Sequence, residues 1–187
     1  RIDVLLAVDG PLHAALAEVA DRVRVRDLCV LRLATPVHTL FKATIAAPWY
    51  LAAAAHDMAR ADLVYINTTI IADFMAAARW IPGCHVIHVR EIPKPRALPV
   101  ICALLRWSRA RLIFNSGATC DAFATFPERR RAIIHNGVDP VEGATPPDLP
   151  PRFTPERRLR IAMLGRISDW KGQDLLIESL VCLSAGR

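Results

Sequence analysis

Short apolar runs alternate with longer helical patterns along this chain, and this alternation limits the possible folds more than any other feature of the sequence. The apolar runs lie at 2–8, 23–28, 61–69, 85–89, 111–115 and 132–135, and the helical patterns at 12–20, 37–60, 71–80, 97–110 and 116–126. Strands that alternate with helices pair in parallel and are covered by those helices. The sequence therefore predicts an α/β fold, a Rossmann-like parallel sheet with flanking helices.

A proline-rich segment divides the chain into two parts. Residues 140–155 hold six of the fourteen prolines, a density typical of an extended connector. RLRIAMLG then predicts a new strand and GQDLLIESLVCL a new helix. We expect a domain over 1–139, an interdomain linker over 140–157, and the first strand and helix of a second Rossmann-like domain over 158–187. One strand and one helix do not bury their apolar faces alone, so we expect this second domain to be incomplete.

The composition favours a globular cytoplasmic protein. A hydrophobic content of 53% supplies a sizeable core. The longest uncharged run, Ala43–Ala55, is shorter than the roughly 20 residues of a membrane span. The five cysteines are scattered without the spacing of a zinc site, so we predict reduced thiols in the core and no metal site. The opening residues read as a strand and a turn and do not resemble a secretion signal.

The basic charge is concentrated in the middle of the chain. The net charge is +6, and residues 90–160 alone carry 13 Lys and Arg against 7 Asp and Glu. Such a surface suits phosphates or the headgroups of an anionic membrane. Nucleic acid is a poor match, because only 6% of residues are aromatic. The plain alternative is a solvated, arginine-rich surface.

Polar residues follow three of the predicted strands. Ligands of open parallel sheets bind outside the carboxyl ends of the strands, so these residues are candidates for a cleft or an acceptor site. They are Asn67 and Thr68 after the strand at 61–69, His88, Arg90 and Glu91 at the end of the strand at 85–89, and Asn136 and Gly137 after the strand at 132–135.

Each candidate also has a purely structural interpretation. His88 is either an acid–base or hydrogen-bonding group that faces a cleft or a satisfied histidine at a sheet edge, and His85, three positions earlier, points to the opposite face of a straight strand. Arg90 and Glu91 form either an ion pair or substrate contacts. Asn136-Gly137 is a typical turn dipeptide with positive φ.

The stretch LGRISDWKGQDLLIESL, residues 164–180, predicts an anion site. Glycine after a strand permits close approach of a ligand, and a following helix directs its amide groups and the positive end of its dipole at the bound group. Arg166 offers a planar fork for phosphate oxygens, and Lys171 a compact ammonium, between Gly165 and Gly172. The order differs from both G-x-x-x-x-G-K-S/T and G-x-G-x-x-G. We therefore predict a diphosphate-binding loop, with a solvent-facing Arg and Lys as the alternative.

Several stretches together resemble the retaining glycosyltransferases of family 4. GRISDWKGQDLLIESL is similar to the start of the family's donor-binding domain, and IIHNGVDP to its N-G-V-D segment before the interdomain linker. FNSGATCDAF resembles its strand and Ser-capped helix. ADLVYINTT followed by VIHVREIP is similar to the strands that line its acceptor-side cleft. The matches follow the family's order along the whole chain.

This resemblance implies a GT-B fold and the retaining transfer of a hexose from a nucleotide-diphosphate donor, of UDP or GDP type, to a glycan or lipid-linked acceptor. Gly165, Arg166, Lys171 and Gly172 would bind the donor diphosphate, and His88 would lie beside the reacting sugar as the catalytic residue. The family usually needs no metal and no further cofactor. Its basic amino-terminal domain often approaches the inner face of an anionic membrane, which fits the charge of residues 90–160.

The resemblance also implies parts that these residues do not contain. The family's first strand and glycine-rich loop would precede Arg1, and its E-x7-E stretch would follow Arg187. We therefore expect no catalysis by these 187 residues alone. Two other functions remain open: another sugar-nucleotide enzyme of GT-B fold, such as an epimerase or a phosphorylase, and a non-catalytic domain that binds an anion or a membrane surface.

Overall fold

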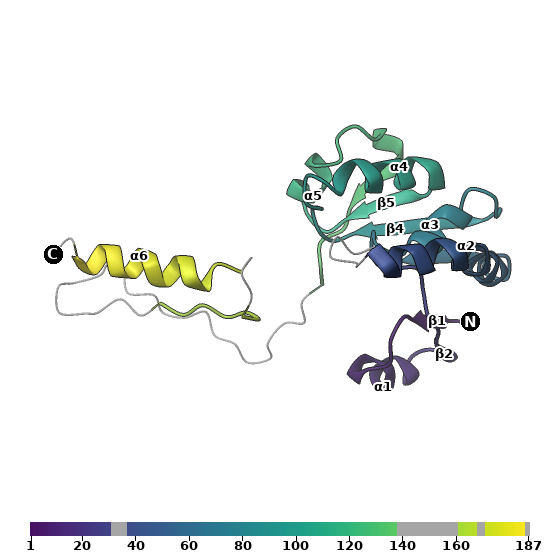
Figure 1. Ribbon diagram of the computed structural model, residues 1–187, viewed down its shortest axis with the longest axis horizontal. Coiled ribbons are helices and arrows are strands. Elements are labelled where there is room, and N and C mark those ends of the chain that lie inside the picture. The colour runs from purple at the N-terminus through teal and green to yellow at the C-terminus, as the bar shows by residue number, and fades with distance from the viewer. Residues whose placement is uncertain (31–36, 138–160, 168–170, 186–187) are drawn as a thin grey trace. The chain divides into compact units, whose positions relative to one another are not determined.

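The computed structural model describes residues 1–30, 37–137, 161–167 and 171–185, with the backbone alone for 37–44 and 184–185 (Figure 1). The chain divides into two compact units, Arg1–Val138 and Asp139–Arg187. The predicted domain boundary falls one residue after this division. Each unit is described by itself.

A four-stranded parallel sheet forms the centre of the first unit. Its strands are β3 (Leu63–Ile66), β4 (Cys84–Val89), β5 (Arg111–Phe114) and β6 (Arg131–Ile133), in that order across the sheet. All three neighbouring pairs are parallel. Helix α2 (Val37–Met58) precedes β3, and helices α3 (Ala72–Ala77), α4 (Leu98–Ser108) and α5 (Gly117–Asp121) lie in the connections between the strands. The predicted α/β class with a parallel, Rossmann-like sheet is confirmed.

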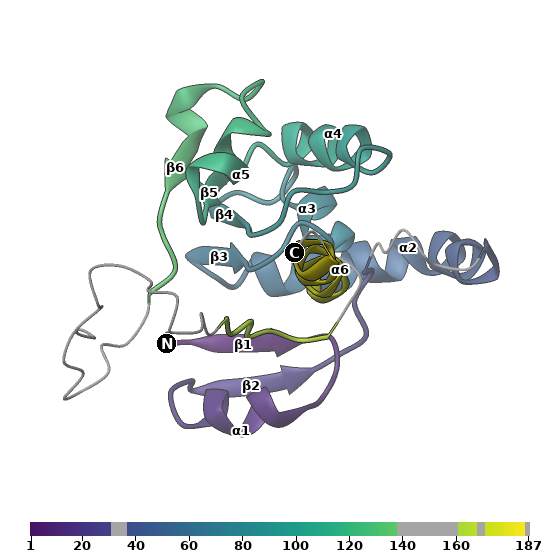
Figure 2. The same cartoon turned by 90° about the vertical axis from the view of Figure 1, so that its left-hand side faces the viewer.

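A second, two-stranded parallel sheet precedes this one. It consists of β1 (Asp3–Leu6) and β2 (Arg22–Val25), joined by helix α1 (Pro11–Ala17). Polar contacts attach the carboxyl end of β2 to the rest of the unit: Arg24 pairs with Asp57 at 2.9 Å, and the Ala72 N–H donates to the Cys29 carbonyl. Figure 2 shows β1 between β2 and the four-stranded sheet. The predicted single sheet is therefore divided between β1 and β3 in the structure.

The hydrophobic core lies on one face of the four-stranded sheet. Alternate residues of the strands, among them Ile66, Ile87 and Phe114, are buried in one cluster with Met75 of α3 and Leu105 of α4. Most residues of the opposite face are exposed or half-buried. On the strand β3, for example, Leu63 is 57% exposed and Tyr65 50% exposed.

The second unit differs from the predicted strand and helix. Helix α6 (Gln173–Ala185) forms as expected, but the described residues 161–164 adopt no strand. A strand is stable only when its backbone pairs with a neighbour, and this segment has no paired strand in the described part of the chain. Within the described residues, no helix combines the length and the apolar character needed to span a bilayer.

The prediction that the cysteines lie in the core is only partly right. All five are free thiols, and Cys102 and Cys120 are buried. Cys84 and Cys182 are exposed. Cys84 is exposed because its strand position directs it to the open face of the sheet.

Candidate functional site

Hydrogen bonds link the carboxyl ends of all four strands of the main sheet. Arg90, after β4, donates to the Asn67 side-chain oxygen after β3 at 3.5 Å. The Asn115 amide, after β5, donates to the Arg90 carbonyl at 3.0 Å, and His135, after β6, contacts the Asn115 carbonyl through Nδ1 at 3.2 Å. The edge at which the sequence predicts ligand binding is thus a connected polar surface.

His88 lies beside this polar edge, one residue before the end of β4. Its side chain is on the open face of the sheet, yet the residue is only 9% exposed. Tyr65, from the neighbouring strand β3, contacts the imidazole Nδ1 through its hydroxyl at 2.5 Å. The other ring nitrogen, Nε2, is buried and has no hydrogen-bond partner within the described residues. One nitrogen of His88 is therefore held by Tyr65, and the other is buried without a partner among the described residues.

Burial favours the neutral form of the His88 imidazole. Desolvation lowers its pKa from 6.5, and the nearby positive charge of Arg90 lowers the pKa further. A neutral imidazole carries one donor and one acceptor nitrogen, and the bond at Nδ1 decides which role remains for Nε2. If the Tyr65 hydroxyl donates to Nδ1, then Nε2 carries the proton and donates to a ligand oxygen.

His85 lies on the opposite face of the same strand, as its spacing from His88 predicts. It is 7% exposed, and its Nε2 is also buried without a partner among the described residues. Desolvation lowers its pKa below 6.5. The imidazole lines a pocket of about 470 Å³ at the amino-terminal end of the strands, with Ala78, Pro82, Ser108 and Ala110 among its neighbours.

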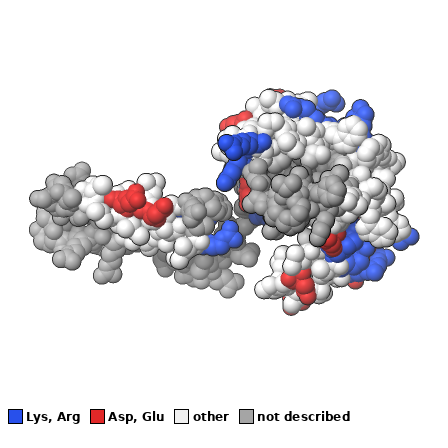
Figure 3. Space-filling view, viewed as in Figure 1, with Lys and Arg blue, Asp and Glu red and all other residues white. Residues whose placement is uncertain are grey.

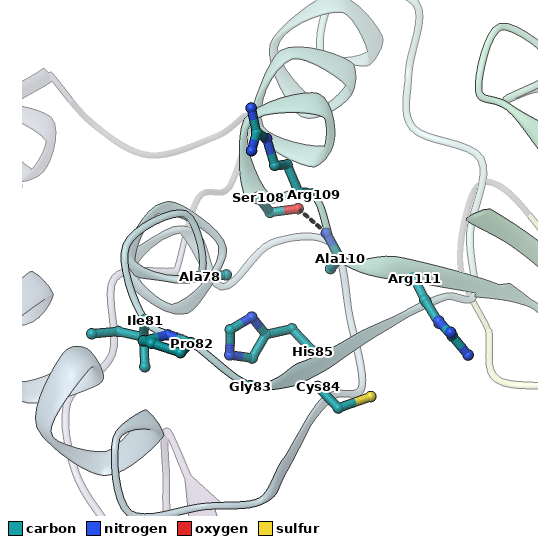
Figure 4. Close-up of a pocket in the computed structure, with 10 residues that line it drawn as sticks. All are labelled: Ala78, Ile81, Pro82, Gly83, Cys84, His85, Ser108, Arg109, Ala110 and Arg111. Carbon is teal, nitrogen blue, oxygen red and sulfur yellow. Dashed lines mark hydrogen bonds between the residues drawn. The ribbon is translucent and has the colours of Figure 1, made fainter. Parts of the chain in front are cut away.

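The lining of this pocket includes the Ser108 hydroxyl and the charged side chains of Arg109 and Arg111. Figure 4 shows that Arg109 and Arg111 extend away from the His85 imidazole and that Cys84 lies on the other side of its strand. The pocket is at the end of β4 opposite to the predicted site. We therefore interpret His85 as the structural member of the histidine pair, enclosed between the sheet and the ends of α3 and α4.

The remaining strand-end candidates have different outcomes. The Thr68 hydroxyl accepts a hydrogen bond from the Ile70 amide at 3.4 Å, a contact that supports the turn after β3. Within the described residues, no ion pair joins Arg90 to Glu91, so that interpretation is wrong, and Arg90 contacts Asn67 instead. Asn136 and Gly137 are exposed, and neither has a positive φ, so the predicted turn conformation is also wrong.

The predicted diphosphate loop lies in the second unit, directly before α6. Gly172 has φ +74°, a left-handed conformation that favours glycine, and its carbonyl accepts the bond from the Leu176 amide that begins the helix. The Gln173 side chain donates to the Arg166 carbonyl at 3.1 Å, which ties the loop to the first turn of α6. Arg166 and Lys171 are both exposed.

Gly165 is under a weaker constraint than Gly172. Its φ is not positive, and an added Cβ would meet the Gln173 side chain at an ordinary contact distance of 3.7 Å. The expectation that Gly165 lets a ligand approach the backbone closely remains a prediction.

Two of the three consecutive arginines in the basic middle of the chain have structural roles. Arg130 is half-buried, and its guanidinium donates to the carbonyls of Leu105 and Ala110, at the carboxyl end of α4. Arg131, also half-buried, contacts the Cys120 sulfur. Only Arg129 of the three is exposed. Figure 3 shows Lys and Arg at separate places on this face of the first unit, not in one patch.

Three residues of this site were not predicted from the sequence. Tyr65 sits inside a strand and reads as a core aromatic, and Asn115 and His135 were assigned to the ends of strands without a role. The available signal was their position, because each is at or next to the carboxyl half of a strand in a parallel sheet.

No family model, curated protein or solved structure matches this chain. The chemistry of the site is therefore argued from its own residues. Within the described residues, no group of three or more His, Cys, Asp or Glu is placed to hold a metal ion.

Proposed function

We propose that this chain is part of a retaining glycosyltransferase that moves a hexose from a UDP or GDP sugar to a glycan or lipid-linked acceptor. The observation that carries the proposal is His88, a buried imidazole at the carboxyl end of a parallel strand, with Nδ1 bound to Tyr65 and Nε2 without a partner in the described structure. A ligand hydroxyl at Nε2 would satisfy this nitrogen, which is costly to leave unpaired when buried.

The polar edge beside His88 suits a sugar or another polyol. Asn67, Arg90 and Asn115 present amide and guanidinium groups in one connected row, and a sugar offers several hydroxyls that both donate and accept. Arg90 adds a positive charge that attracts an anionic group of a donor or acceptor. These residues would orient the substrate beside His88.

The loop before α6 would hold the leaving diphosphate. When the bond between the anomeric carbon and the diphosphate oxygen breaks, the electron pair goes to that oxygen and negative charge grows on it. The acceptor oxygen bonds to the same carbon, and the proton of the acceptor hydroxyl passes to the departing diphosphate. Cations and a helix amino terminus stabilise such charge more as it grows. Arg166, Lys171 and the first turn of α6 supply these groups, and α6 has 13 residues.

Titration of the chain with UDP and with GDP tests the donor half of the proposal. We expect one of them to bind, and we expect the double variant Arg166→Ala/Lys171→Ala to weaken binding by about tenfold or more, because charge-assisted hydrogen bonds to phosphate are lost. His88→Asn should leave diphosphate binding unchanged, and Arg111→Ala, which removes an exposed charge elsewhere, is the control. Absence of binding by both nucleotides, or equal binding by the double variant, would overturn the donor assignment.

Analysis of the product distinguishes transfer from the two related reactions. A UDP or GDP sugar incubated with an acceptor and the longer enzyme of which this chain is proposed to be part would give a glycosylated acceptor if the proposal holds. Epimerised sugar would instead indicate an epimerase, and a sugar phosphate formed with inorganic phosphate would indicate a phosphorylase.

We also propose that the protein acts in the cytoplasm at the inner face of an anionic membrane. The support is the excess of 13 Lys and Arg over 7 Asp and Glu in residues 90–160. Sedimentation with vesicles of anionic lipid tests this proposal, and Arg129→Glu with Arg109→Glu should reduce it, since both side chains are exposed. Equal sedimentation with vesicles of neutral lipid would contradict it.

A further inference from the structure

Thr119, in helix α5, is a buried hydroxyl that the site described above does not use. The residue is 4% exposed, and its Oγ1 donates to the Asn115 side-chain oxygen at 2.6 Å, which is shorter than its 3.3 Å contact with the Ser116 carbonyl. The Ser116 hydroxyl contacts the same Oγ1. A hydroxyl has a single proton, so donation to Asn115 leaves Ser116 as the donor in that contact.

The bond from Thr119 decides which way the Asn115 amide points. In an asparagine side chain Oδ1 only accepts hydrogen bonds and Nδ2 only donates them. With Oδ1 on the Thr119 hydroxyl, Nδ2 faces the Arg90 carbonyl and donates to it at 3.0 Å. The reversed amide would place Oδ1 against the Arg90 carbonyl oxygen, so two acceptors would meet.

Asn115 in turn holds Arg90 just beyond the end of the paired sheet. Val89 and Phe114 are the last paired residues of β4 and β5, and Arg90 and Asn115 follow them directly. The Asn115 side chain supplies the kind of hydrogen bond that a backbone amide supplies within the sheet. The Asn115 carbonyl is itself held by His135 Nδ1 at 3.2 Å. The backbone of Arg90 is therefore anchored where the loop after β4 begins.

Arg90 and His88 make successive contacts with the neighbouring strand. His88 bonds to Tyr65, and Arg90, two residues later, bonds to Asn67 at 3.5 Å, two residues after Tyr65. The positive charge of Arg90 is close enough to lower the pKa of His88. The place at which Arg90 is held therefore affects the charge state of the imidazole.

The other groups that face His88 are not part of this series of hydrogen bonds. Strand β3 contributes the Tyr65 hydroxyl, and β5 contributes the apolar Ile113 opposite His88 and Arg111 two residues earlier. In the described structure none of these three side chains bonds to Thr119. A change at Thr119 therefore reaches the imidazole through the series of hydrogen bonds.

We propose that Thr119 and Asn115 are positioning residues of the candidate site, which hold Arg90 beside His88 and keep its positive charge where the substrate binds. A cation held there disfavours the protonated imidazole and attracts an anionic group of the substrate. The inference rests on the proposed function in placing the substrate beside His88. The position of Arg90 is nevertheless measured without any substrate.

NMR titration of the His88 ring in the free chain tests the proposal. Arg90→Gln removes the neighbouring cation and should raise the pKa of His88. Thr119→Val, which keeps the shape of the side chain and lacks the hydroxyl, should raise this pKa in the same direction because Arg90 is released. Thr119→Ser keeps the hydroxyl and should retain the original pKa. The proposal is wrong if either Arg90→Gln or Thr119→Val leaves the His88 pKa unchanged.

The double variant Arg90→Gln/Thr119→Val asks whether Thr119 acts through Arg90. If it does, the His88 pKa of the double variant should equal that of Arg90→Gln alone, since the effects of residues that act as one series do not add. A further rise in the double variant would show a different route from Thr119 to the imidazole and would overturn the proposal.

Variants of Asn115 and Ser116 separate positioning from the stability of α5. Asn115→Ala removes the middle of the series without a change in α5, and it should raise the His88 pKa as Thr119→Val does. Ser116→Ala removes the helix cap but leaves the bond from Thr119 to Asn115, and it should retain the original pKa. Equal rises in Ser116→Ala and Thr119→Val would show that helix stability controls the imidazole, contrary to the proposal.

Exchange of the Asn115 Nδ2 protons reports the first link directly. We expect Thr119→Val to speed this exchange by about fivefold or more, because the amide loses the bond that fixes its orientation. Unchanged exchange would show that Thr119 does not orient Asn115. A failure of the chain to bind UDP or GDP would count against the proposed function alone, since none of these measurements uses a nucleotide.

Discussion

The Tyr65 hydroxyl and the His88 imidazole Nδ1 meet across two neighbouring parallel strands, at 2.5 Å. The register pairs Tyr65 with Val86, and His88 follows two residues later on the same face. The contact is therefore a direct result of strand pairing. It leaves Nε2 of His88 as the ring nitrogen without a partner among the described residues, and it gives Tyr65 a positioning role.

Tyr65→Phe tests this positioning role. The variant removes only the hydroxyl, so the imidazole keeps its place in the strand but loses the bond that selects its tautomer. We expect the ¹⁵N chemical shifts of the His88 ring to change to those of a mixture of tautomers, with a loss of stability of about 1 kcal/mol. Unchanged ring shifts would show that Tyr65 does not set the tautomer. Tyr50→Phe, which loses a hydroxyl bond to Asp27, is a control for hydroxyl removal elsewhere.

The two buried histidines predict a loss of stability in acid. Desolvation lowers the pKa of His85 and of His88 below 6.5, so the unfolded chain binds protons more readily than the folded chain. Stability is then full above pH 6.5 and decreases as the pH falls from 6.5 towards the folded pKa values. Urea unfolding at a series of pH values measures this slope. The double variant His85→Gln/His88→Gln should flatten it, and an equal slope in that variant would contradict the prediction.

The raised pKa of Asp73 has the opposite effect on stability: it stabilises the folded state in acid, whereas the two histidines destabilise it. Burial raises this pKa above 3.8, although bonds from the Phe74 and Cys29 amides oppose that effect. The folded state therefore favours the protonated carboxyl, and this contribution is lost as the pH rises above 3.8. Asp73→Asn should remove this dependence and leave the histidine slope unchanged.

Arg130 and Arg129 form a matched pair for a test of stability. The Arg130 guanidinium donates to the carbonyls of Leu105 and Ala110 at the end of α4, and the Leu105 carbonyl also accepts a bond from the Ser108 hydroxyl. We expect Arg130→Ala to cost about 2–3 kcal/mol of unfolding free energy. Arg129→Ala, at the exposed neighbouring position, should change it by less than about 0.5 kcal/mol. Equal costs for the two variants would show that the α4 carbonyls do not depend on Arg130.

Ser116 is predicted to stabilise the start of α5. Its Oγ accepts a hydrogen bond from the Thr119 amide at 3.2 Å, which confirms the cap expected from the sequence. Ser116→Ala should cost about 1 kcal/mol in urea unfolding, and Ser116→Asp should recover most of this loss because its carboxylate also caps helices. If Ser116→Asp is no more stable than Ser116→Ala, then Ser116 acts through its contact with Thr119 Oγ1 and not as a cap.

The two glycines of the loop before α6 should respond differently to alanine. Gly172 has φ +74°, where a Cβ costs about 1–2 kcal/mol, whereas an added Cβ at Gly165 meets only an ordinary contact. We expect Gly172→Ala to speed amide exchange in the first turn of α6 by about fivefold or more and Gly165→Ala to leave it nearly unchanged. Similar exchange in both variants would show that the left-handed conformation is not retained in solution.

The sequence predicted well those features that depend on local pattern. The parallel α/β class followed from the alternation of apolar runs and helices, and His85 and His88 lie on opposite faces because side chains alternate along a strand. Ser116 caps α5 because its hydroxyl reaches an amide three residues away. These features arise from residues close together in the chain, so the sequence alone carries the signal.

Features that depend on residues far apart were decided only by the tertiary structure. Tyr65 reaches His88, and Arg90 reaches Asn67 and not Glu91, through a strand register that no local pattern specifies. Arg130 satisfies carbonyls twenty or more residues away, so its charge does not serve the surface that composition suggested. The division of the sheet between β1 and β3 has the same origin, since pairing of a strand depends on which strand lies beside it in space. Sequence pattern fixes which face of an element is apolar, and only folding decides which neighbours that element meets.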